Sequence, residues 1–164
     1  MSTIKTIGII GGMSWESSAS YYRLINQDIA RRLGGYHSAR LILYSVDFAE
    51  IEAYQRQDDW ARAGTALADA ALRCVAAGAE ILALATNTMH LVADEVARAA
   101  GVPFIHIADA TARAVRGMDR VLLLGTRFTM EREFFRERIE SAGIPVTVPD
   151  APERRRIDGI IFDE

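Results

Sequence analysis

Short runs of consecutive apolar residues alternate along the chain with longer segments in which apolar residues recur at helical spacing. The continuous runs are typical of strands that are buried on both faces of a sheet. They lie at residues 4–10, 39–46, 80–85 and 104–107. The helical segments follow them and are expected at residues 15–33, 58–77, 89–100 and 109–116. This alternation predicts an α/β fold with parallel strands and helices on both faces of the sheet.

A second, similar unit starts after Gly117. An apolar run at residues 120–124 is followed by Gly125-Thr126, and a helix at 130–142 and a strand at 145–148 are expected next. We therefore predict two similar domains, residues 1–117 and residues 118–164. The second has only two expected strands, and a two-stranded unit is marginally stable alone. A further helix is expected to open at residues 154–164 and ends there without a capping residue. We therefore expect this domain to be incomplete and further chain to belong with it.

Composition excludes several classes of protein. The 164 residues carry a net charge of −3, whereas nucleic-acid-binding domains are usually basic. No apolar run approaches the roughly 18 residues of a membrane span, and the N-terminus has no basic segment of a signal peptide. The single cysteine, Cys74, cannot form an internal disulfide and is expected to be an inert core thiol. These features predict a cytoplasmic protein without nucleic-acid or membrane partners.

The basic residues argue against two cofactor classes. Eighteen are arginines, and the one lysine, Lys5, lies at the N-terminal end of the first apolar run. This lysine fits neither the Schiff base of pyridoxal phosphate enzymes nor a phosphate-binding loop. The three histidines, His37, His90 and His106, have no metal-ligand spacing, so no metal site is predicted. For His90, two interpretations stay open, one near a site and the other as a capping or partly buried side chain.

Polar residues gather where the predicted strands end, which is where parallel sheets bind their ligands. The candidate segments are Gly11–Ser14, Asp47, Thr86–Thr88 and Thr126–Thr129. The paired glycines either expose backbone N–H groups to an anion or form a tight turn. Capping of the next helix explains one residue of Thr86-Asn87-Thr88 but hardly all three. Two hydroxyl-rich loops would suit the carboxylate of a small amino acid.

Five motifs together resemble the aspartate/glutamate racemase family, in its broad-specificity or L-selective branch. Gly-Gly-Met-Ser-Trp-Glu-Ser and Thr-Asn-Thr-Met-His are the most specific of them. The motifs span residues 8–17, 45–48, 85–90, 106–110 and 125–131. The resemblance implies a homodimeric isomerase of amino acid metabolism, with its active site in the cleft between two α/β domains. It also implies racemisation without pyridoxal phosphate, by one group that removes the α-proton and another that returns a proton from the opposite face.

The resemblance also assigns roles to individual residues. Thr86 stands where the family usually has the first catalytic cysteine, and it would act on that face of the substrate. The residues implied to bind the substrate are Met13, Asn87, Thr88, Thr126 and Thr129. Arg56 either contacts the side-chain carboxylate of the substrate or is a plain surface arginine. The second cysteine, expected in a Gly-Cys-Thr-Glu motif, has no counterpart up to Glu164, so we expect racemisation to be impaired in this form.

Two alternatives stay open at this stage. One is a sister activity on the same scaffold, such as hydantoin racemisation or decarboxylation of a malonate-type acid. The other is a non-catalytic protein that binds carboxylates, for which Thr86 and the lack of a second cysteine are the motivation. The sequence does not choose between aspartate and glutamate.

Overall fold

The chain folds into two compact units. The structure, a computed structural model, describes residues 4–163. One unit contains the residues up to Thr86 together with Val92–Ile105, and the second contains Asn87–Leu91 and the residues from His106 onward. The chain therefore passes from the first unit to the second and back before it finally leaves at His106. These two units are groups of residues that pack together, and they do not test the predicted domain boundary near Gly117, which stays a prediction.

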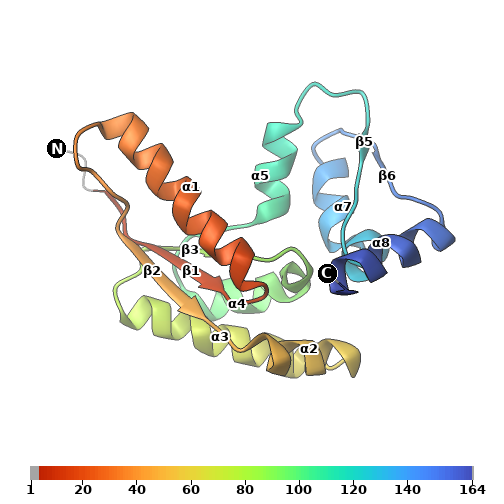
Figure 1. The fold of residues 1–164 in the computed structure, drawn as a ribbon, viewed down its shortest axis with the longest axis horizontal. Coiled ribbons are helices and arrows are strands. Elements are labelled where there is room, and N and C mark those ends of the chain that lie inside the picture. Colours follow the sequence, from red (N-terminus) through yellow and green to blue (C-terminus); the bar gives the residue numbers. More distant parts are fainter. Residues whose placement is uncertain (1–3, 164) are drawn as a thin grey trace. The chain divides into compact units, whose positions relative to one another are not determined.

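The first unit is a four-stranded parallel sheet with helices on both faces, as the sequence pattern predicts. The strand order is β2-β1-β3-β4, and every pairing is parallel. In chain order its elements are β1 (Ile7–Gly11), α1 (Trp15–Leu33), β2 (Leu41–Ser45), α2 (Phe48–Arg56), α3 (Trp60–Ala76), β3 (Ile81–Leu84), α4 (Ala93–Ala100) and β4 (Phe104–Ile105). Figure 1 shows α1 on one face of the sheet and α3 on the other.

The central strand β1 is apolar along its length because both of its faces are covered. Ile9 and Ile10 point to opposite faces and are 2% and 0% exposed. Gly8 lies under α3, where a β-carbon would be 2.5 Å from Leu82 Cδ2 and 2.9 Å from Ala79 Cβ. Leu82 belongs to β3 and Ala79 to the loop that follows α3, and Cys74 Cβ of α3 would be 3.2 Å away. Glycine is therefore required at position 8 by the close packing of β1 against β3 and against the end of α3 with its loop.

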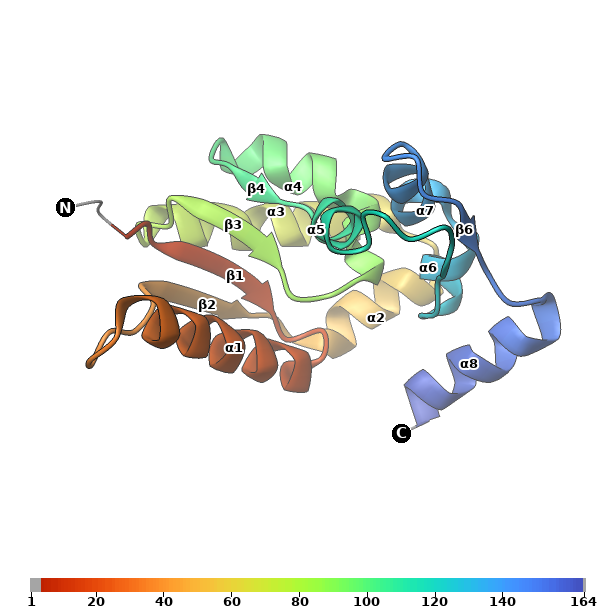
Figure 2. The ribbon, with the colours of Figure 1, turned by 90° about the horizontal axis from the view of Figure 1, so that it is seen from above.

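The second unit has its own small core around two short parallel strands. Its elements are the 3₁₀ turn η1 (Thr88–Val92, whose last residue lies in the first unit), α5 (Ile107–Ala114), β5 (Val121–Leu122), α6 (Arg127–Glu131), α7 (Glu133–Glu140), β6 (Val146–Thr147) and α8 (Ala151–Asp163). β5 pairs with β6, and Figure 2 labels α5, α6, α7, β6 and α8 of this unit. The core consists of Ala108, Ala112, Leu123, Phe135, Ile139 and Ile144.

Three local expectations are corrected. The helix predicted at 130–142 is two helices, α6 and α7, which meet at Arg132 with extended backbone (φ −86°, ψ 149°). Helix α2 was not predicted, and Arg56 is its last residue. The segment after β3 begins as a 3₁₀ turn before α4, so it is not one continuous helix. Among the described helices, none has the length and apolar character that crossing a membrane requires.

Replacing Gly8 with alanine tests the close packing of β1 against β3 and the loop after α3. The Gly8→Ala variant should lose about 1–3 kcal/mol of unfolding free energy, because the new methyl group overlaps Leu82 and Ala79. Urea denaturation followed by circular dichroism measures this. Leu72→Ala, on the exposed face of α3, is the control and should change stability by less than about 0.5 kcal/mol. A Gly8→Ala protein as stable as the parent would contradict the packing described.

Candidate functional site

The glycine loop after β1 is explained by its backbone geometry. Gly12 has a φ of +94°, and a β-carbon there would lie 2.3 Å from the Val46 carbonyl oxygen. The Gly12 N–H donates to Ser18 Oγ at 2.8 Å, and Ser18 Oγ donates to the Ser14 carbonyl. Ser14 itself caps α1 by accepting from the Ser17 N–H. The tight turn therefore accounts for glycine at position 12, and anion binding by this loop stays a hypothesis.

Other polar groups at the strand ends of the first unit have structural partners. Asp47 caps α2 by accepting from the Ala49 N–H at 3.1 Å. Arg56 forms an ion pair with Glu52 one turn earlier and is 77% exposed, and this hydrogen bond raises the pKa of Arg56 above its ordinary value. Met13 is buried at 6% exposure, and Thr86 is half-buried directly after β3.

Three threonine hydroxyls meet in the second unit. Thr88 Oγ1 lies 2.8 Å from Thr126 Oγ1, and Thr126 Oγ1 lies 3.2 Å from Thr129 Oγ1. Thr126 is also the N-cap of α6 and accepts from the Thr129 N–H at 3.4 Å. Thr88 comes from η1, and the other two come from the loop and helix after β5. Thr129 is fully buried, so its hydroxyl supports Thr126 from the interior.

The donors in this cluster can be counted. Each threonine hydroxyl supplies one O–H donor and two acceptor sites. The two contacts between hydroxyls use two of the three O–H groups, so among the described residues one O–H group is left to donate to a ligand oxygen. Next to Thr88, the Asn87 Oδ1 atom is buried and accepts no hydrogen bond from the described part of the chain. The threonine cluster therefore offers one hydrogen-bond donor, and Asn87 offers one acceptor, to a small polar ligand.

His90 lies in the interior of the second unit. It is 2% exposed, and its Nε2 atom accepts from the Ile107 N–H at 3.2 Å, at the start of α5. Its ring packs edge-on against His106, with centroids 4.5 Å apart. His106 is the N-cap of α5 and accepts from the Ala108 N–H through Nδ1. Of the two interpretations of His90, the structure supports the buried, capping one.

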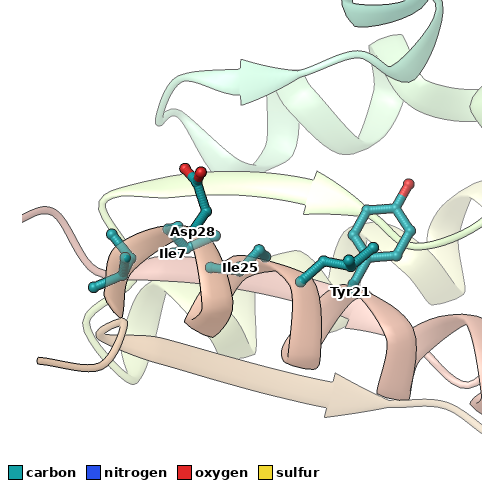
Figure 3. Close-up of a pocket in the computed structure, with 6 residues that line it drawn as sticks. Ile7, Tyr21, Ile25 and Asp28 are labelled. Atoms are coloured by element: carbon teal, nitrogen blue, oxygen red, sulfur yellow. The ribbon is translucent and has the colours of Figure 1, made fainter. Parts of the chain in front are cut away.

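A pocket of about 450 Å³ lies in the first unit, between α1 and the start of β1. Figure 3 shows Tyr21, Ile25 and Asp28 of α1 beside Ile7 of β1 around it. Parallel sheets bind ligands at the carboxyl ends of their strands, and Ile7 is at the opposite end of β1. Burial raises the pKa of Tyr21, which keeps its hydroxyl neutral.

Two other features of residues 4–163 bear on possible chemistry: potential metal ligands and the thiol of Cys74. The described histidine, cysteine and acidic side chains form no group of three that could hold a metal ion. Cys74 is 0% exposed on the inner face of α3, and burial raises the pKa of its thiol. The core position expected from the sequence is confirmed, and the inertness of the thiol stays a prediction.

The family is decided by comparison with known proteins. The Asp/Glu/Hydantoin racemase family model matches residues 10–164. The chain belongs to the Asp/Glu/Hydantoin racemase family. This match includes the motifs that carry Thr86–Thr88 and Thr126–Thr129, so the resemblance drawn from the sequence is confirmed at the level of the family.

Relatives with solved structures share the fold over nearly the whole chain. An Asp/Glu racemase candidate from Yersinia pestis is 52% identical, with a TM-score of 0.90, over 98% of this chain and 71% of its own. An aspartate racemase homologue from Pyrococcus horikoshii OT3 is 40% identical, with a TM-score of 0.80 and the same two coverages. The aspartate racemase of Picrophilus torridus, at 22% identity and a TM-score of 0.74, shares the fold.

A curated relative is more distant. The broad specificity amino-acid racemase RacX of Bacillus subtilis (strain 168) is 24% identical over 153 residues, which are 88% of this chain. The chain spans 64% of the length of that racemase.

Burial of Cys74 predicts an unreactive thiol. Its raised pKa keeps the thiolate fraction low, since the neutral form is favoured in the folded chain until the pH rises above the ordinary range for thiols, about 8.5. A thiol reagent at neutral pH should label the unfolded chain in urea completely while the native chain stays unlabelled. Labelling of the native chain at the unfolded rate would contradict the position of Cys74.

Proposed function

We propose that this chain carries the substrate-binding threonines of a cofactor-independent racemase that acts on aspartate or glutamate. The observation that carries the proposal is the cluster of Thr88, Thr126 and Thr129, found in a chain of the racemase family. The cluster has one hydroxyl to donate to an anionic oxygen, and hydrogen bonds to charged groups are the stronger ones. We assign the α-carboxylate of the substrate to this cluster.

Asn87 complements the carboxylate contact. Its buried Oδ1 atom is an acceptor, and the α-ammonium group of an amino acid is a hydrogen-bond donor that can satisfy it. A free carboxylic acid without an amino group would leave this oxygen unsatisfied, at a cost of about 1–3 kcal/mol. The proposal therefore favours an amino acid over a malonate-type acid.

The proposed reaction, racemisation of an amino acid without a cofactor, needs two groups on opposite faces of the substrate Cα. One removes the α-proton, the negative charge spreads into the carboxylate, and donors around the carboxylate stabilise the resulting enediolate. A second group then delivers a proton from the other face. We propose Thr86, together with Met13 and Arg56 of the first unit, for the roles that the family resemblance gives them. A threonine hydroxyl is far too weak an acid to be a resting base, so Thr86 would donate or relay the proton.

The 164 residues contain one cysteine, and it is buried in a core. We therefore expect this chain to bind aspartate or glutamate without exchanging the α-proton. Proton NMR of L-aspartate in D₂O measures this exchange. Loss of the α-proton signal at an enzymatic rate would show that these residues hold a complete pair of bases.

The same experiment separates the alternative functions. Turnover of hydantoins or malonate-type acids, with none of aspartate, would identify a sister activity of the family. Tight binding of aspartate without exchange, together with no turnover of hydantoins or malonate-type acids, would favour a non-catalytic carboxylate-binding protein. A homodimer in the cytoplasm is the assembly and location we propose, from the family resemblance and the composition.

The role of Thr88 can be tested by removing its hydroxyl alone. Thr88→Val should weaken aspartate binding about tenfold or more, because a hydrogen bond to a charged group contributes about 1.5–3 kcal/mol. Calorimetric titration measures the affinity. The control is Thr147→Val, an exposed threonine on β6 of the same unit, which should bind like the parent. Equal affinities of the two variants would remove Thr88 from the site.

A further inference from the structure

The turn η1 is tied to the second unit by two side chains that point in different directions. A 3₁₀ turn has three residues per turn, so side chains two positions apart lie about 120° apart around its axis. Thr88 accordingly meets Thr126 at the start of α6, while His90 meets Ile107 at the start of α5. The His90 N–H also donates to the Asn87 carbonyl at 3.0 Å, which closes the turn itself.

The hydrogen bond to His90 defines its chemical state. Because Nε2 accepts the Ile107 N–H, it carries no proton, and the neutral ring holds its proton on Nδ1. The bond also satisfies one of the backbone N–H groups that the first turn of α5 leaves without a helical partner. His106 satisfies another through Nδ1 and packs against the His90 ring, so both rings are held in place by α5.

We propose that His90 is a positioning residue, which holds η1 against α5 so that Asn87 and Thr88 face the amino acid together. His90 does not touch the substrate: its acceptor nitrogen is used by the Ile107 amide, and its side chain is 2% exposed. This inference rests on the proposed function for the role of Asn87 and Thr88. The placement of η1 itself is independent of that function.

The substitution His90→Gln keeps an acceptor near the position of Nε2, whereas His90→Leu fills the space without one. In His90→Leu, amide exchange of Ile107 should be about tenfold faster, and aspartate should bind about tenfold more weakly, as for the loss of a hydrogen bond at a buried donor. In His90→Gln, both quantities should return most of the way to the parent values. His37→Leu, at an exposed histidine, is the control and should change neither.

A measurement on the parent protein covers the case in which His90→Leu does not fold. Long-range proton–nitrogen NMR of the histidine rings should show an unprotonated Nε2 in His90. A protonated Nε2, or equal effects of the leucine and glutamine variants on binding, would overturn the proposal. If the parent does not bind aspartate, the proposed function fails for this chain, while the Ile107 exchange rates and the His90 protonation state still decide whether the histidine holds η1.

Discussion

The hydrogen bond between Thr88 and Thr126 is the contact on which the account of this chain depends. Its length is 2.8 Å, and it joins residues 38 positions apart in the sequence. Thr88 belongs to the short stretch Asn87–Leu91, which leaves the first unit after β3 and packs in the second. Thr126 is at the same time the N-cap of α6. The hydrogen bond between these two hydroxyls therefore joins the stretch Asn87–Leu91 to the start of α6. The same two hydroxyls belong to the proposed carboxylate site.

The sheet of the first unit supplies the rigid base from which this crossing starts. Parallel strands with both faces covered leave little freedom where they end, and β3 is buried at Leu82, Ala83 and Leu84. The neighbouring polar residues Ser14 and Asp47 are used to begin helices. Polar residues at the ends of strands thus either cap the next helix or belong to the candidate binding site. Only the contacts of each side chain in the structure distinguish these two roles.

Much of the fold was predictable because the signals are local. The buried strands were recognised from continuous apolar runs, and α1 was bounded correctly by its cap at Ser14 and by Gly34. Helix α2 was missed, since its cap, Asp47, resembled a ligand group. The break at Arg132 is invisible to helical periodicity, which continues through it. The role of His90 depends on Ile107, and a contact 17 residues distant has no local signature.

The most direct test of the threonine site is a titration of the chain with L-aspartate, observed at the methyl groups of its threonines by NMR. The account predicts that the Thr88 and Thr126 signals shift together with a single affinity, with Thr129 following through its contact with Thr126. The signals of Thr111 on α5 and Thr147 on β6 should stay in place. Shifts confined to Thr111 or Thr147, or no shift in Thr88 and Thr126 at saturating aspartate, would contradict the assignment of the carboxylate to this cluster.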